Sequence, residues 1–275
     1  MQPKELSCMQ VWGGNQPTLS TFEKAGADIW LYSRPYDQSH GGGDTYYLSS
    51  CASGRITRML LADISGHGQS ASAVAISLRD LMRKHINQIF PNKLFEKING
   101  EFTIDQSNDR FATAILHSYF APTRKLRICN AGHPPPFVYR QNTKQWTKVE
   151  LPTQAKLQDL PFGITENSDY QEFEIDFTKG DLLFSYTDGL ADLNTVDGNS
   201  LGIAGIQTLL KTADAEHPQT ILDLIVETIE QSEKQHEVID DISLLLVRAN
   251  TKAITLRDNL LAPFRWLGTY LNKES

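Results

Sequence analysis

Cysteine is scarce in this 275-residue sequence, and the three that are present, Cys8, Cys51 and Cys129, lie far apart with no Cys-x-x-Cys spacing. This pattern excludes a disulfide framework and a cysteine-based zinc site, and it fits a reducing compartment. A long apolar run is also missing, both at the N-terminus, where a secretion signal would lie, and in the rest of the chain. We therefore expect a cytoplasmic protein that does not insert into a membrane.

Basic charge is the third shortage. The chain carries 26 Lys and Arg against 33 Asp and Glu, a formal net charge of −7, and its basic residues form no cluster. A nucleic-acid partner is disfavoured, because a phosphate backbone is bound through clustered Lys and Arg. With 40% hydrophobic and 21% charged residues, the composition is that of an ordinary globular protein. The length allows a sizeable core, and the lack of repeats favours a single catalytic domain.

What the chain does contain is a sharply patterned stretch at residues 59–73, Met-Leu-Leu-Ala-Asp-Ile-Ser-Gly-His-Gly-Gln-Ser-Ala-Ser-Ala. An apolar run stops at Asp63, two glycines follow, and apolar residues then recur at helical spacing. Because glycine tolerates positive φ and close backbone approach, the pattern predicts a strand, a tight loop and a helix. Asp63 is thereby placed at the end of a buried strand.

Acidic residues are predicted at other strand ends too. Asp44 follows three glycines, and Asp188 follows an apolar run. Asp240 and Asp241 directly precede another apolar run. Carboxylates that converge repel one another unless a cation lies between them. Because no pair of Cys or His residues accompanies them, these hard oxygen donors favour Mg²⁺ or Mn²⁺ over zinc.

Strand and helix patterns continue along the chain. Strands are predicted at residues 29–32, 45–50, 56–62, 111–120, 126–129, 137–140, 172–177, 181–187 and 242–247. Helices are predicted at residues 69–90, 94–99, 203–211 and 218–233. Residues 1–26 are expected to form an arm with one strand or a short helix, and residues 141–169 are polar and rich in turns. Antiparallel strands with paired helices between them indicate an α+β protein.

Five motifs in a fixed order carry a family resemblance. They are Gly-Gly-Asp44, Asp63-Ile-Ser-Gly-His-Gly, Asn130-Ala-Gly-His-Pro-Pro-Pro, Gly-Asp181 through Tyr-Thr-Asp188-Gly, and Asp240-Asp-Ile-Ser. The chain resembles the SpoIIE-type branch of the metal-dependent (type 2C) protein serine/threonine phosphatases. The resemblance implies an αββα four-layer sandwich of two antiparallel β-sheets flanked by helices. It divides the chain into an N-terminal arm at 1–26, a phosphatase domain at 27–248 and a C-terminal extension at 249–275.

The resemblance also implies a site for two divalent cations, Mg²⁺ or Mn²⁺. Asp63 would bridge both metals and so take part in catalysis, and the backbone carbonyl of Ile64 would be a further ligand. Asp188 and Asp240 would hold one metal, and Asp44 would bind the other directly or through water. Such a pair of cations lowers the pKa of a shared water and holds the phosphoryl oxygens during in-line displacement.

Two histidines and one missing arginine complete the comparison. His67 lies two residues beyond the position of a histidine that is proposed as general acid in the wider family, so it is expected either to protonate the leaving group or to hydrogen-bond within its loop. His133 is expected either to bind substrate or to hold the turn before three prolines. The wider family's phosphate-gripping arginine is missing from residues 38–44, as is usual in this branch. Its absence leaves the phosphate to the metals, to His40 or to backbone amides.

The function implied by the resemblance is that of a protein serine/threonine phosphatase, in which a water that bridges the metals attacks phosphoserine or phosphothreonine. The expected partner is a phosphorylated regulatory protein, in this branch a STAS-type anti-anti-sigma factor of bacterial partner switching. A second hypothesis is a catalytically inactive pseudophosphatase that only binds a phosphoprotein, and the full set of carboxylates argues against it. A third, a metal-dependent phosphodiesterase or nuclease, is disfavoured by the missing basic surface.

The segment 249–275 has an apolar face of its own. Apolar residues recur at helical spacing from Leu256 to Leu271, and Pro263 predicts a break between two short helices. So much apolar surface must be buried against something. We expect it to pack either on the sandwich of its own chain or against a partner, as in a homodimer or a regulatory contact.

Overall fold

The computed structural model describes residues 3, 4, 6, 10–36, 41–51, 54–66, 68–104, 110–150, 158–195, 198–235 and 240–253. Within them the strands are β1 (Val11–Gly14), β2 (Thr18–Lys24), β3 (Ala27–Arg34), β4 (Thr45–Cys51), β5 (Ile56–Ile64), β6 (Ala112–Phe120), β7 (Lys125–Ala131), β8 (Phe137–Arg140), β9 (Gln145–Lys148), β10 (Glu172–Asp176), β11 (Leu182–Tyr186) and β12 (Ile242–Ala249). The helices are α1 (Gln69–Lys84), α2 (Pro91–Ile104), α3 (Asp188–Asp192), α4 (Gly202–Thr212) and α5 (Pro218–Glu233).

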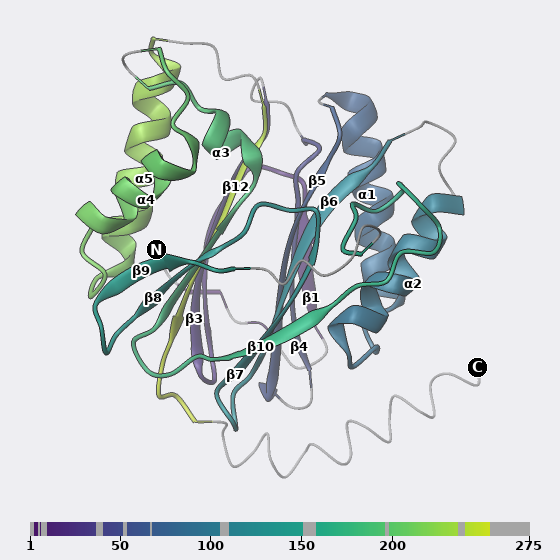
Figure 1. Ribbon diagram of the computed structural model, residues 1–275, viewed down its shortest axis with the longest axis horizontal. Helices are drawn as coiled ribbons and strands as arrows, with labels where there is room; N and C mark the ends of the chain where they lie inside the picture. The colour runs from purple at the N-terminus through teal and green to yellow at the C-terminus, as the bar shows by residue number, and fades with distance from the viewer. Residues whose placement is uncertain are drawn as a thin grey trace.

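The strands form two sheets that lie face to face (Figure 1). One sheet has the order β1-β4-β5-β6-β7-β10 and the other the order β2-β3-β12-β11-β8-β9. Neighbouring strands pair antiparallel throughout both orders. Helices α1 and α2 cover the outer face of the first sheet, and α4 and α5 cover the outer face of the second (Figure 1). The predicted αββα four-layer sandwich is therefore confirmed.

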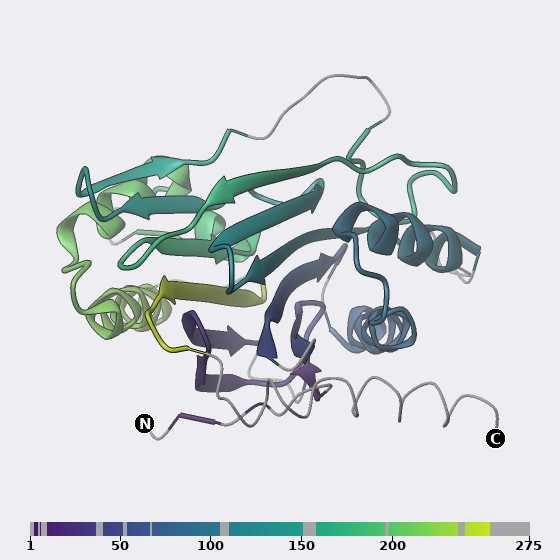
Figure 2. The ribbon, with the colours of Figure 1, turned by 90° about the horizontal axis from the view of Figure 1, so that it is seen from below.

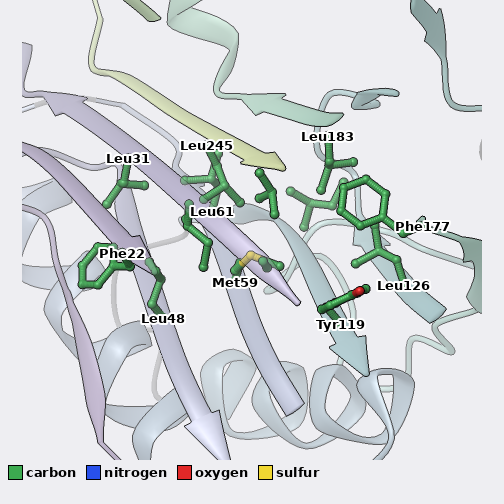
Figure 3. Close-up of a cluster of buried hydrophobic side chains, with 14 of the residues drawn as sticks. Phe22, Leu31, Leu48, Met59, Leu61, Tyr119, Leu126, Phe177, Leu183 and Leu245 are labelled. Carbon is green, nitrogen blue, oxygen red and sulfur yellow. The ribbon is translucent and has the colours of Figure 1, made fainter. Parts of the chain in front are cut away.

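Alternation along the strands fills the space between the sheets. In β5, Met59 and Leu61 belong to the cluster between the sheets, whereas Leu60 and Ala62 belong to the cluster beneath α1 and α2. This is the period of two that a strand imposes on its side chains. Figure 3 shows Met59 and Leu61 directed toward the opposite sheet, where Leu245 of β12 lies.

The helices bury apolar stripes on the outer faces of the sheets, on opposite sides of the molecule (Figure 2). The buried residues of α1 are Ala71, Ala75, Leu78 and Met82. The buried isoleucine and leucine residues of α5 are Ile221, Leu222, Ile225 and Ile229. Spacings of three or four residues, with Ile221 and Leu222 adjacent, place each set on one face of its helix, and each large side chain that is removed from water contributes about 1.5–3 kcal/mol.

Several elements differ from the expectations. The region predicted as an arm with one strand or a short helix supplies two strands, because β1 pairs with β4 and β2 pairs with β3. The helix predicted at 69–90 ends at Lys84, and Pro91 begins α2 rather than only ending α1. Proline suits a first helical position, where no N–H bond is lost. Strand β9 and helix α3 were not predicted; β9 is polar and buries only Trp146.

Some predictions lie outside the described residues. His67 and His40 are among them, as is residue 254 onward, which includes most of the extension predicted at 249–275. In the described part of the chain, no helix combines the length and the apolar character needed to cross a bilayer.

Candidate active site

The strand pairing brings five acidic residues to strand ends. In the first sheet Thr45 pairs with Ala62, so Asp44, just before β4, and Asp63, near the end of β5, lie at the same edge. In the second sheet β11 ends at Tyr186, which is paired with β12. Asp188 follows that end, and Asp240 and Asp241 precede the start of β12, so these acids also share an edge.

Asp241 joins the two edges. Its carboxylate accepts hydrogen bonds from the backbone N–H groups of Gly43, at 2.6 Å, and Asp44, at 3.3 Å, and from that of Tyr36. Asp241 is 2% exposed, and its charge is compensated by these amides. The neighbouring Asp240 instead accepts the Asp241 N–H, at 2.8 Å. The two adjacent carboxylates are thus bound differently, which the sequence did not predict.

Two glycines allow this close approach. A Cβ atom at Gly42 would lie 2.3 Å from Asp241 Oδ1, and a Cβ atom at Gly189 would lie 2.0 Å from the carbonyl oxygen of Asp241. Both distances are well inside van der Waals contact, so only glycine fits at these positions. The glycine run before Asp44 and the Asp188-Gly189 pair are therefore required by the geometry around Asp241.

Asn15, from the turn between β1 and β2, holds the other side of the glycine loop. The Gly42 N–H donates to the Asn15 carbonyl, and Asn15 Nδ2 donates to the Gly42 carbonyl, both at 3.0 Å. The same Nδ2 also donates to Ser72 Oγ of α1, at 2.7 Å. Asn15 is 3% exposed. Sequence reasoning missed this residue, and its only signal was the Gly-Gly-Asn turn at 13–15.

Burial and mutual repulsion dominate the electrostatics. Burial, followed by repulsion from Asp63 and Asp241, raises the pKa of Asp44 well above its usual value. Burial also raises the pKa of Asp63 to about 8, with further repulsion from the acids of the second sheet, Asp188, Asp240 and Asp241. The carboxylates of both sheets are therefore close enough to interact, and a cation between them would remove the repulsion.

Asp188 is the most open of these acids. Its side chain is exposed to solvent at the first position of α3, and partial burial, followed by repulsion from Asp192, raises its pKa. The backbone N–H groups at this helix start lower the pKa in part. The site is therefore buried from solvent at Asp44 and accessible to solvent at Asp188.

The residues present fit a hard divalent cation. Asp44 Oδ1 is buried and has no hydrogen-bond partner among the described residues, which is costly for a carboxylate oxygen unless a cation binds it. The carbonyl oxygen of Ile64 lies 3.1 Å from where a Cβ atom at Gly43 would be, so it faces the loop that leads to Asp44. In the described part of the chain no three His, Cys, Asp or Glu side chains are already arranged to hold a metal ion.

His133 lies behind the strand ends. Its Nδ1 is 2.9 Å from Oγ1 of Thr113, the residue that pairs with Asp63 across β5 and β6. Asn130 accepts the His133 N–H and donates to the His133 carbonyl, which holds the turn. His133 is 3% exposed, and burial lowers its pKa to about 3, so it is neutral at pH 7. The structure thus brings His133 next to the partner of Asp63 and leaves it little surface for a bound protein.

The sequence is similar to a known protein family and to two phosphatases of Bacillus subtilis. The family model of Stage II sporulation protein E (SpoIIE) matches residues 53–250. The phosphoserine phosphatase RsbP of Bacillus subtilis is 25% identical over 199 residues, which cover 69% of this chain and 45% of RsbP. The phosphoserine phosphatase RsbU of the same organism is 23% identical over 223 residues, which cover 80% of this chain and 63% of RsbU. This chain thus matches about half to two thirds of the length of these relatives.

Solved structures share the fold. The RsbU and RsbW domains of Rv1364c from Mycobacterium tuberculosis superpose with a TM-score of 0.69 at 23% identity, covering 87% of this chain and 64% of that chain. RsbX in complex with magnesium superposes with a TM-score of 0.61 at 16% identity, covering 85% of this chain and all of RsbX. The family match over residues 53–250 confirms the resemblance drawn from the five motifs, and the chain belongs to the SpoIIE family.

Proposed function

We propose that this chain is a divalent-metal-dependent protein phosphatase that hydrolyses phosphoserine or phosphothreonine on a regulatory protein. One observation carries the proposal: acids from both sheets interact at one end of the sandwich, where Asp44 has a buried oxygen with no hydrogen-bond partner among the described residues and the pKa of Asp63 is raised to about 8. A phosphate monoester is an anion that repels hydroxide, so its hydrolysis needs positive charge at the site. Carboxylates can supply that charge only by binding cations.

The proposed ligands are those expected from the sequence. Asp63 would hold both cations, and the Ile64 carbonyl would add a neutral oxygen. Asp188 and Asp240 would hold a cation on the open side, and Asp44 would do so on the buried side. When bound, Mg²⁺ or Mn²⁺ ions supply a water of lowered pKa and neutralise phosphoryl oxygens. The magnesium bound by RsbX, a protein of the same fold, supports this choice.

The chain's own residues hold the ligands in place. Asp241 fixes the backbone before Asp44 from one side, and Asn15 fixes it from the other. Asp240 remains the proposed ligand of the Asp240–Asp241 pair, because the amides of Tyr36, Gly43 and Asp44 already use the carboxylate oxygens of Asp241. We keep His67 as the proposed proton donor to the leaving serine. His133 contacts Thr113, the strand partner of Asp63. We propose that His133 also contacts the substrate.

A phosphorylated STAS-type anti-anti-sigma factor is the proposed substrate. Support comes from the relatives: RsbP and RsbU are phosphoserine phosphatases, and the solved Rv1364c structure combines an RsbU domain with an RsbW domain. The acidic net charge of −7 also disfavours nucleic-acid substrates.

The segment 249–275 is proposed to bury its apolar face on this domain or in a homodimer.

Hydrolysis of p-nitrophenyl phosphate and of a phosphoserine STAS protein tests the proposal. Wild type with Mn²⁺ should release phosphate from both, and excess EDTA should stop it. Asp63→Asn should lose activity by at least about 10²-fold, because a neutral amide cannot bridge two cations. Asp223→Asn, an exposed acid on α5, should match wild type. Binding of the phosphoprotein without hydrolysis would instead favour a pseudophosphatase, and hydrolysis that survives EDTA would refute the proposal.

A further inference from the structure

Thr187 connects the two sheets at the site. The residue lies between the end of β11 and Asp188, and it is fully buried. Its Oγ1 donates to Asp44 Oδ2 of the first sheet, at 2.8 Å. The backbone N–H of Ser243 in β12 donates to the same Oγ1, at 2.9 Å. One hydroxyl therefore links β12, the start of α3 and the segment before β4.

These contacts fix the direction of the hydroxyl proton. A backbone N–H can only donate, so Ser243 N occupies a lone pair of Thr187 Oγ1. The hydroxyl then has one proton to give, either to Asp44 Oδ2 at 2.8 Å or to the Ser243 carbonyl at 3.5 Å. That carbonyl already accepts the Thr187 N–H, at 3.0 Å. The shorter bond to a carboxylate is the stronger one, so the proton points to Asp44.

The position of Thr187 in its helix makes this use of the hydroxyl unusual. Thr187 is the N-cap residue of α3, where threonine commonly accepts a hydrogen bond from the first turn of its own helix. Here it makes no side-chain cap hydrogen bond. Its hydroxyl is given to Asp44 instead, and α3 starts without that stabilisation.

The bond determines which oxygen of Asp44 is available. Oδ2 is occupied by Thr187, while Oδ1 is buried and has no hydrogen-bond partner among the described residues. A carboxylate free to rotate could present either oxygen, or turn both toward protein donors. Resting on the proposed function, we propose that Thr187 is the positioning residue that holds Asp44 with Oδ1 toward the cation site. It acts through Asp44 and contacts neither cation nor substrate.

Outer hydrogen-bond partners of metal ligands commonly contribute about 10- to 100-fold to metal affinity. Thr187→Val keeps the side-chain shape and removes the hydroxyl, whereas Thr187→Ser keeps the hydroxyl. Ser185→Ala is the matched control, because Ser185 is also a buried hydroxyl of this segment but bonds to His117. It should lose stability without changing the cation site.

The experiment is calorimetric titration of the metal-free full chain with Mn²⁺, with thermal unfolding of each variant measured in parallel. Thr187→Val should bind Mn²⁺ about 10- to 100-fold more weakly than wild type, and Thr187→Ser within about threefold. Ser185→Ala should keep wild-type affinity whatever its loss of melting temperature. Activity should follow the same order through the Mn²⁺ concentration needed for half-activation, with kcat recovered at high Mn²⁺.

The outcomes separate this proposal from the proposed function. Wild-type Mn²⁺ affinity in Thr187→Val would overturn the positioning role and leave the phosphatase assignment standing. Wild type that binds no Mn²⁺ would overturn the assignment itself, and the positioning role with it. If Thr187→Val does not fold, Thr187→Ser decides: near wild-type affinity supports the role, and a loss of about tenfold or more overturns it.

Discussion

His117 Nε2 and Ser185 Oγ lie 2.7 Å apart and join the two sheets through the middle of the sandwich. His117 belongs to β6 and Ser185 to β11, and both side chains are fully buried. Burial, followed by repulsion from the nearby His133, lowers the pKa of His117 to about 3. The histidine in this bond is therefore neutral at pH 7.

Acid should destabilise the protein through this histidine. The pKa of His117 is lower in the folded state than its usual value of 6.5, so the unfolded chain takes up a proton first. Stability is complete above pH 6.5 and falls as the pH drops toward 3, by about 2 kcal/mol at pH 5. His117→Gln keeps a group able to bond Ser185 and removes the titration. Urea unfolding at pH 8 and pH 5 should show a smaller difference in the variant than in wild type; equal differences would remove His117 as the cause.

Glycine at position 189 should be irreplaceable. Alanine there would place its Cβ 2.0 Å from the Asp241 carbonyl oxygen, and either α3 or the start of β12 would have to move. We expect Gly189→Ala to lower the free energy of unfolding by about 1–3 kcal/mol. Gly100→Ala is the matched control, since a Cβ atom there meets open space in α2, and it should add about 0.5–1 kcal/mol. Thermal unfolding that ranks the two variants the other way would contradict the geometry.

Arg58 should stabilise the connection between α1 and α2. It is 2% exposed and donates to the carbonyls of Ile86, Gln88 and Ile89. Arg58→Met leaves these carbonyls without their donor and should cost about 2–3 kcal/mol in urea unfolding. Arg83→Met, which removes a solvent-exposed ion pair with Asp80 at 3.6 Å, should change stability by less than about 0.5 kcal/mol. Similar losses in both variants would mean that the buried bonds add nothing.

Metal-free protein should be destabilised by its own acids at high pH. The pKa of Asp63 is about 8 in the folded state, above its usual value of 3.8, so folding favours the protonated form. The apo protein is therefore most stable at low pH with respect to this group, and it loses that stability as the pH rises from about 4 through 8. In EDTA at pH 8, Asp63→Asn should unfold at a higher urea concentration than wild type. Its free energy of unfolding should be higher by about 1–3 kcal/mol. A variant less stable than wild type at pH 8 would argue against the repulsion.

The features that could be predicted from the sequence are those that depend on residues close together in the chain. The apolar run before Asp63 and the glycines after it define a strand, a loop and a helix within fifteen residues, and the structure has β5 and α1 there. Acids beside apolar runs predicted that Asp44 and Asp188 would lie at strand ends. The order of the five motifs gave the family resemblance, and the resemblance predicted the αββα sandwich in which these acids lie.

Distant contacts explain what was not predicted. Asp240 and Asp241 are the same residue type side by side, and the amides of Tyr36, Gly43 and Asp44, about 200 positions away, bind Asp241. Asn15 gave no sign of its bonds to Gly42 and Ser72, because these form only when the two sheets and α1 assemble. Beyond the end of α1, Arg58 donates to the carbonyls of Ile86, Gln88 and Ile89, and these long-range bonds have no signal in the local sequence.

Thermal unfolding of the full chain during titration with Mn²⁺ tests most directly whether the strand-end acids form a cation site. A ligand of the folded state alone raises the melting temperature by mass action. Wild type should therefore melt at progressively higher temperature as Mn²⁺ rises to millimolar concentrations, Asp223→Asn should do the same, and Asp63→Asn should start at or above the wild-type apo temperature and respond little. A wild-type melting temperature that does not change with Mn²⁺, or an equal rise in Asp63→Asn, would contradict the account.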